Sequence, residues 1–256
     1  MSAPENKKKK ESLLHFARFE FKYIMSKKQR DDVEAHLVNF LEYDPFVAST
    51  PGHKYTVRSL YYDDPAYSAF HDKIDGLHTR SKFRLRTYST DISEKAPFFL
   101  EIKGRNNNLV FKHRTPVDIR DATWPFTRGS QLTSAIISNS TPSEVLDQFQ
   151  IGVFKNRIAP VALIDYKRRP YISKYDPTFR ITFDEQIAAF NSDSIFPESR
   201  DQCRDVISGH TVMEVKFHHH MPSWFHRVIQ AHQLKRVSIS KICSGMEALD
   251  LAYDEN

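Results

Sequence analysis

Apolar and charged residues alternate along several short stretches of this 256-residue sequence, and this pattern constrains the fold more than any other feature. The stretch FRLR begins at Phe83 and the stretch LEIKGR begins at Leu100, and in both stretches every second residue is charged. Successive side chains of a β-strand point to opposite faces, so this alternation is typical of a strand with one apolar and one charged face. Residues 80–105 therefore predict two strands joined by a loop, with a hydrophobic core on one side of the sheet.

Strand-like patterns recur through the chain and predict about eight strands in antiparallel meander order. The further stretches are residues 17–25, 55–63, 109–117, 160–171, 179–184 and 211–217. Helices are expected over residues 26–43, 64–76, 125–150 (in two pieces), 222–235 and 240–253, and a loop over residues 190–205. We predict a mainly β (α+β) fold with one domain over residues 17–256, preceded by a flexible basic tail over residues 1–16.

The charged face of these strands has two possible surroundings. An antiparallel sheet commonly turns one polar face to solvent. Here, however, the polar positions are mostly Arg, Lys and Glu, and the triplet E-x-K occurs three times in the predicted strands, starting at Glu20, Glu101 and Glu214. If the strands close into a barrel, the charges converge on an interior that must hold water, a polyanion, or a polyanion with metal, because burying unpaired charge is very costly. A solvent-facing sheet and a charged tunnel both remain open on this evidence.

A charged tunnel of this composition would suit a chain of phosphates. Arginine binds phosphate as a two-pronged fork and lysine binds it as a point charge. Carboxylates are poor phosphate ligands, but they bind hard divalent cations such as Mg²⁺ or Mn²⁺, which bridge phosphate oxygens. Phosphoryl transfer needs little beyond such alignment and charge stabilisation.

The composition narrows the classes of partner and compartment. The net charge of +5 and the pI near 9.0 favour an anionic partner. Only seven glycines occur, and no GxGxxG or GxxxxGK[ST] motif is present, which argues against a nucleotide fold built on glycine loops. Cys203 and Cys243 do not make a disulfide framework or a zinc site and are typical of a cytoplasmic protein. No apolar run approaches the ~20 residues of a membrane span, although the lysines at positions 7–10 would suit association with a membrane partner.

Several short motifs occur in an order that resembles the catalytic domain of the vacuolar transporter chaperone (VTC) polyphosphate polymerases, which belong to the triphosphate tunnel metalloenzyme (CYTH-like) superfamily. The motifs are R-x-E-x-K-Y at 18–23, S-L-Y-Y-D at 59–63, K-x-x-G-x-x-x-R-x-K-x-R-x-R-x-Y at 73–88, L-E-I-K at 100–103, E-V-K at 214–216 and S-K at 240–241. Each motif is weak alone, but together they cover nearly the whole chain.

The resemblance implies a closed, eight-stranded antiparallel β tunnel with flanking helices. It implies transfer of the ATP γ-phosphate to a growing polyphosphate chain, with release of ADP and dependence on Mn²⁺ or Mg²⁺. Carried over to matching positions, the catalytic residues would be Lys22, Arg84, Arg86, Lys103 and Lys241. Further phosphate or nucleotide contacts would be Lys82, Lys112, Arg114, Tyr166, Arg168, Arg180, Lys216 and Ser240. Glu214 would be the main metal ligand, with Glu101 and Glu20 as weaker candidates.

One departure from the family pattern bears on the reaction. Tunnel phosphatases typically open with E-x-E-x-K, whereas Arg18 stands here at the first Glu position, which favours the polymerase branch. The sensing domain and membrane helices of the eukaryotic polymerases are not found in the sequence, so we expect a stand-alone domain. A tunnel triphosphatase and a non-catalytic binder of polyphosphate or nucleotide remain alternatives. Arg–aromatic neighbours are too few to support a nucleic-acid partner.

Overall fold

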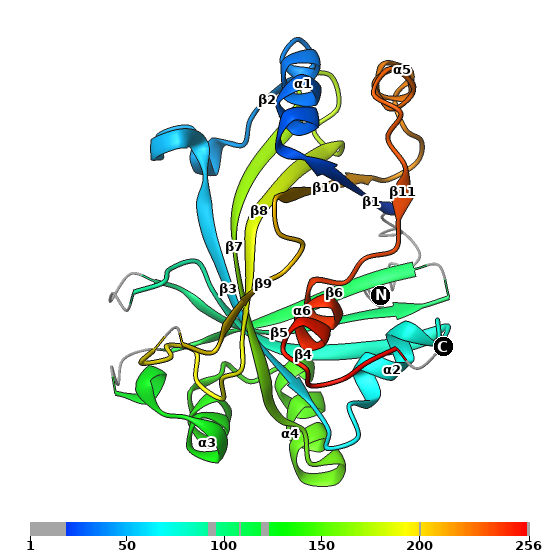
Figure 1. Cartoon of the computed structure of the whole chain (residues 1–256). Coiled ribbons are helices and arrows are strands. Elements are labelled where there is room, and N and C mark those ends of the chain that lie inside the picture. Colours follow the sequence, from blue (N-terminus) through cyan, green and yellow to red (C-terminus); the bar gives the residue numbers. More distant parts are fainter. Residues whose placement is uncertain (1–18, 92–95, 108, 119–122, 200, 255–256) are drawn as a thin grey trace, which may run out of the picture.

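The computed structural model describes residues 19–91, 96–107, 109–118, 123–199 and 201–254, and its centre is one large antiparallel sheet (Figure 1). Eleven strands follow the order β11-β1-β10-β8-β7-β3-β4-β5-β6, with β2 paired to β7 and β9 paired to β8. The strands are β1 (Phe19–Ser26), β2 (Leu41–Tyr43), β3 (Tyr55–Asp63), β4 (Thr79–Thr87), β5 (Phe98–Asn106), β6 (Leu109–Val117), β7 (Ala159–Ser173), β8 (Arg180–Phe190), β9 (Cys203–Asp205), β10 (His210–Phe217) and β11 (Arg236–Val237). The predicted basic tail lies outside the described residues.

Six α-helices and three short 3-10 helices accompany the sheet in the described part of the chain. The α-helices are α1 (Lys27–Leu37), α2 (Ser68–Ile74), α3 (Gly129–Asn139), α4 (Glu144–Asn156), α5 (Ser223–Ala231) and α6 (Lys241–Ala248), and the 3-10 helices are η2 (Pro45–Val47), η3 (Pro51–His53) and η4 (Trp124–Phe126). Ser26 and Ser143 cap α1 and α4 by accepting hydrogen bonds from backbone N–H groups of the first turn. None of the helices in these described segments is long and apolar enough to cross a membrane.

The mainly β, antiparallel fold with flanking helices matches the sequence prediction, but its closed eight-stranded form is not confirmed. Eight strands correspond to the predicted stretches, and the short strands β2, β9 and β11 were not predicted. The ladder of paired strands ends at β11 on one side and at β6 on the other, so the described sheet is open. The prediction that the first helix continues to residue 43 was wrong, because α1 ends at Leu37 and Leu41 pairs with Ser173 of β7.

The two faces of the sheet pack against different helices. The outer face carries two apolar clusters: one packs against α3 and α4 through residues such as Leu100 and Phe149, and the other packs against α1 and α5 through residues such as Met213 and Phe225. Helix α6 lies against the inner face instead, where Ile242 and neighbouring residues join a third cluster (Figure 1). The sheet therefore curves around α6 and presents the rest of its inner face to a polar interior.

Strand register brings the charged positions of distant segments onto this inner face. Lys22 of β1 lies opposite Glu214 of β10, and Glu214 lies opposite Thr182 of β8. On the other side of the sheet, Arg84 of β4 lies opposite Glu101 of β5. Because paired residues share a face, the alternation read in each strand adds up to one continuous charged surface.

Candidate phosphate-binding site

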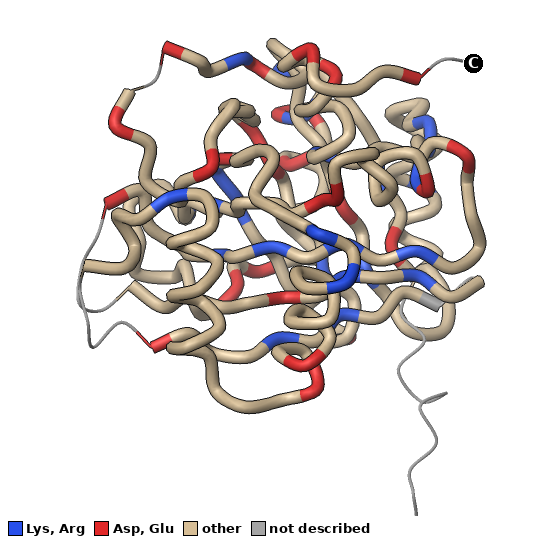
Figure 2. The backbone as a smooth tube through the Cα atoms, turned by 90° about the horizontal axis from the view of Figure 1, so that it is seen from below, with Lys and Arg blue, Asp and Glu red and all other residues tan. Residues whose placement is uncertain are grey.

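The inner face carries far more positive than negative side chains. Its cations include Lys22, Lys82, Arg84, Arg86, Lys103, Lys112, Arg114, Arg168, Arg180, Lys216 and Lys241, and its carboxylates include Glu20, Glu101, Asp184 and Glu214. Figure 2 shows Lys and Arg positions gathered along the strands across the middle of the molecule. We call these fifteen residues the charged lining. Eleven cations against four carboxylates leave a local surplus of positive charge that suits a polyanion.

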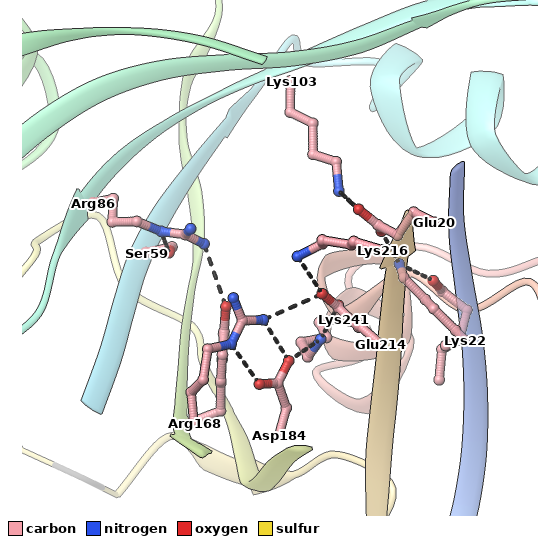
Figure 3. A network of polar contacts seen from close by, with 12 residues as sticks. Glu20, Lys22, Ser59, Arg86, Lys103, Arg168, Asp184, Glu214, Lys216 and Lys241 are labelled. Atoms are coloured by element: carbon pink, nitrogen blue, oxygen red, sulfur yellow. Dashed lines mark hydrogen bonds and ion pairs between the residues drawn. The ribbon is translucent and has the colours of Figure 1, made fainter. Parts of the chain in front are cut away.

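Glu214 and Asp184 form the most densely paired part of the lining (Figure 3). Glu214 accepts hydrogen bonds from Lys241 at 2.7 Å, Lys216 at 3.2 Å and Arg168 at 3.3 Å. Arg168 also donates to both oxygens of Asp184, at 2.6 and 2.7 Å, and Lys241 contacts Asp184 at 2.7 Å. Burial alone would raise the pKa of both carboxyl groups, but these cations hold each pKa below its usual range. Both carboxylates are therefore charged at neutral pH.

The position of Lys241 depends on a close contact between α6 and the sheet. Ser240 caps the helix by accepting a hydrogen bond from the backbone N–H of Cys243, so Lys241 is the first helical residue. A Cβ atom on Gly245 would lie 2.5 Å from Cδ1 of Ile164 on β7. Glycine therefore allows the helix to approach the inner face closely enough for Lys241 to reach Glu214 and Asp184.

Glu101 lies in a second cluster, at the centre of β5. It is fully buried and contacts Arg84 at 2.7 Å, Lys112 at 2.8 Å and Arg86 at 3.6 Å. Burial would raise the pKa of its carboxyl group, but the three cations hold that pKa well below its usual range. Arg84 also donates to the hydroxyl of Tyr61 at 2.8 Å. Glu101 therefore acts as the anionic anchor that holds two arginines and a lysine in the lining.

A third cluster joins the two sides of the open sheet. Glu20 of β1 contacts Lys22 at 3.3 Å and Lys103 of β5 at 3.2 Å, and Figure 3 shows Lys103 reaching across the interior toward β1. Burial lowers the pKa of Lys103 to about 8, although Glu20 opposes this effect. Lys22 also donates to the carbonyl oxygen of Ile239, in the segment between β11 and α6. Side chains thus connect regions that backbone pairing leaves apart.

The remaining predicted residues differ in their burial and in their contacts. Tyr166 is buried, and its hydroxyl lies 3.4 Å from Arg86, while its ring lies under Arg168 and Lys241. Lys82 points to the sulfur of Cys243 at 3.7 Å. Arg180 is half exposed and lies 3.9 Å from Asp44, near the edge of the lining. The Ser240 hydroxyl caps helix α6 by accepting a hydrogen bond. A contact between this hydroxyl and phosphate remains a prediction.

The predicted metal ligands do not gather in one place. Among the described residues, no three or more His, Cys, Asp or Glu side chains come together as a ready metal centre. Glu101 lies with Arg84 and Lys112. Glu20 and Glu214 lie close enough together for the charge of Glu214 to oppose the lysines that hold the pKa of Glu20 below its usual range. Mg²⁺ is commonly held by one or two carboxylates together with substrate phosphates. Glu20 and Glu214 fit that arrangement, and the placement of Glu101 does not support it.

Three polar residues of this region were absent from the predicted site. Asp184 pairs with Arg168 and Lys241, Ser59 accepts a hydrogen bond from Arg86 at 3.0 Å, and Tyr61 accepts one from Arg84. The sequence did contain a signal for Asp184, since the alternation in FRITFD puts it on the face of Arg180 and Thr182. Ser59 and Tyr61 lie two residues apart on β3 and share the inner face in the same way.

An inner sheet face with buried carboxylates and a large excess of arginine and lysine has a charge that suits an anionic ligand. Residues 17–250 match the model of the VTC domain family, so the chain belongs to that family. Among solved structures, a putative adenylyl cyclase, HpAC1 from Hippeastrum, whose title reports a dominant triphosphatase activity, is similar at 12% identity, with 90% of this chain and 96% of that chain covered. Its TM-score of 0.49 is too low to carry an argument. No curated protein sequence matches this chain.

Proposed function

We propose that this protein is a polyphosphate polymerase that transfers the γ-phosphate of ATP to the end of a growing polyphosphate chain. The observation that carries the proposal is the surplus of eleven cations over four carboxylates on the curved inner face, in a chain of the VTC domain family. A phosphate chain is the ligand that offers repeated negative charge along such a surface. The finer assignment of residues follows from where each side chain lies.

Two of the three clusters would bind and align the phosphates. Arg84, Arg86 and Lys112, held by Glu101, would bind one part of the phosphate chain. Lys241 and Arg168, held by Asp184, would lie beside the phosphoryl group that is transferred. These cations stabilise the charge that develops on the β–γ bridging oxygen as its bond to the γ-phosphorus breaks. A terminal oxygen of the acceptor chain forms the new bond to the γ-phosphorus, and ADP leaves.

A divalent cation is the cofactor that the family resemblance implies. Mn²⁺ or Mg²⁺ held by Glu214 and Glu20 would neutralise negative charge on the phosphates. Glu214 accepts hydrogen bonds from three cations, and Glu20 contacts Lys22 and Lys103, so cation binding would require these lysines to shift toward the phosphates. This competition makes metal binding depend on the presence of the phosphate ligand.

Purified protein incubated with ATP and Mn²⁺ tests the proposal when ADP, free phosphate and chain length on a gel are followed together. We expect ADP to accumulate with a growing ladder of polyphosphate and little free phosphate. Free phosphate without a ladder would indicate a triphosphatase instead, because water would then attack the γ-phosphorus in place of a phosphate chain. Polyphosphate binding without turnover under either metal would leave a binding protein.

A matched pair of variants distinguishes the contribution of the charged lining to activity from that of other charged residues. Lys241→Met removes a buried cation from the pair of carboxylates, and we expect loss of the ladder. Lys28→Met removes an exposed lysine of α1 that pairs with Asp32 at the surface, and we expect wild-type activity. Equal activity in both variants would contradict the placement of transfer beside Lys241.

A further inference from the structure

A group of aromatic side chains continues the inner face beyond the charged lining. The ring centroids of Phe46 and Tyr55 are 5.2 Å apart, those of Tyr55 and Tyr88 are 5.7 Å apart, and those of Tyr88 and Phe99 are 6.3 Å apart. Phe46 belongs to η2, Tyr55 begins β3, Tyr88 follows β4, and Phe99 is the second residue of β5. We call these four residues the aromatic rim.

The aromatic rim adjoins the arginines that would bind phosphate. Phe99 lies opposite Arg86 in the ladder between β4 and β5, and Tyr55 lies opposite Arg168 in the ladder between β3 and β7. Tyr88 follows Arg86 by two residues, so the two side chains share a face and lie roughly 7 Å apart along the chain. In a nucleotide, the base and the first phosphate lie a comparable distance apart. The rim is therefore within reach of the base of any nucleotide whose phosphates contact Arg86 and Arg168.

The exposure of the rim differs from that of a hydrophobic core. Phe46 is 64% exposed, and Tyr55, Tyr88 and Phe99 are half-buried. The guanidinium of Arg114 lies 4.4 Å from the ring centroid of Phe99, which adds a planar cation to the group. Aromatic and guanidinium faces are the surfaces on which proteins stack nucleic-acid bases. Burial also raises the pKa of Tyr55 to about 12, so its phenol stays neutral beside the phosphates.

We propose that the aromatic rim binds the base of the nucleoside triphosphate whose phosphates occupy the charged lining. This inference rests on the proposed function, because it requires that the lining binds the triphosphate. It adds that the protein distinguishes a nucleotide from inorganic phosphate chains through stacking at one end of the lining. A phosphate chain has no ring, so its binding does not involve the rim.

Two variants and two ligands test the assignment. Phe46→Ala removes the exposed ring, and Tyr88→Leu replaces a half-buried ring by a smaller apolar side chain. The matched control is Phe154→Ala, since Phe154 is 76% exposed on α4, on the outer side of the sheet. The dissociation constants of ATP and inorganic triphosphate are measured by titration calorimetry in EDTA, which prevents turnover, and circular dichroism verifies that each variant is folded.

We expect each rim variant to bind ATP about 5- to 100-fold more weakly than the wild type, the range that loss of one stacked ring gives. Its affinity for inorganic triphosphate should change by less than about twofold, and Phe154→Ala should affect neither ligand. Unchanged ATP affinity in both rim variants, or an equal loss for both ligands, would overturn the rim as a base site while leaving phosphate binding intact. A wild-type protein that binds neither ligand would instead overturn the proposed function, and the rim proposal with it.

Discussion

The substitution Glu214→Gln distinguishes the contribution of Glu214 to stability from its proposed role in metal binding. Glutamine keeps the size of the side chain but removes a charge that is buried and paired with three cations. Removing one partner of a buried ion pair costs about 3–5 kcal/mol. Lys241 and Arg168 keep their contacts with Asp184 at 2.7 and 2.6 Å, so we expect destabilisation nearer to about 2–3 kcal/mol. Urea denaturation measures this loss.

The same substitution should affect metal-free binding and metal-dependent turnover in opposite directions. At an effective dielectric constant of about 20, a unit charge about 8 Å from a phosphate is worth about 2 kcal/mol. Loss of the Glu214 carboxylate should therefore strengthen metal-free triphosphate binding by about tenfold after screening by salt. Turnover with Mn²⁺ should fall by at least about 100-fold, since a carboxylate ligand is lost.

A carboxylate on the other face of the sheet provides the control. Glu185 of β8 is a partly buried carboxylate that contacts Arg30 and Lys54 outside the charged lining. Glu185→Gln should reduce stability in a similar way but leave turnover and triphosphate affinity unchanged. Wild-type turnover with Mn²⁺ in a folded Glu214→Gln variant would refute the metal assignment.

Three further predictions concern single side chains of the sheet. Arg86→Ala should weaken triphosphate binding by about 10- to 100-fold in calorimetry, and unchanged affinity would mean that Arg86 does not contact phosphate. Within the described segments, the buried hydroxyls of Thr182, in the inner face, and Thr87, in the outer face, make no hydrogen bond. Thr182→Val and Thr87→Val should therefore each leave the free energy of unfolding equal or raise it by about 1 kcal/mol, and a loss in urea denaturation would contradict this. The pKa values of Lys103 and Lys112 are both lowered to about 8, so triphosphate affinity should fall as pH rises through 8, with proton uptake on binding at pH 8.5. Solvent reaches 34% of the Lys103 side chain and 39% of the Lys112 side chain and moderates the effect. Lys103→Arg should reduce the uptake, and the double variant with Lys112→Arg should reduce it further, in calorimetry across buffers of different ionisation enthalpy.

Alternation along the strands was enough to predict most of the sheet from the sequence. The stretches around Phe83 and Leu100 became β4 and β5, and each charged position fell on the inner face. The two-residue strand β11 could not be predicted, because a run of two residues carries no period. The open edge between β11 and β6 could not be predicted from the sequence either. A period of two indicates which residues share a face of a strand, but it does not indicate which strands are neighbours.

The three E-x-K triplets show why residue roles could be predicted only in part. They share one pattern, yet strand register gives their glutamates different surroundings. Glu20 lies opposite Lys216, Glu214 lies opposite Lys22 and Thr182, and Glu101 lies opposite Arg84 and Arg114. Only register, which depends on tertiary packing, distinguishes the two glutamates that lie opposite lysines from the one that lies between two arginines.

Burial decides between the two surroundings that the sequence left open for the charged face. A solvated sheet face would leave its long charged side chains exposed, but Glu101 and Asp184 are fully buried and Arg86 is only 5% exposed. Such burial is tolerated only where opposite charges meet, and the lining supplies ion pairs for each of its four carboxylates. The cations remain in excess, and their mutual repulsion disfavours the folded state unless anions offset it. A bound polyanion, as proposed above, would therefore offset the positive charge of the lining.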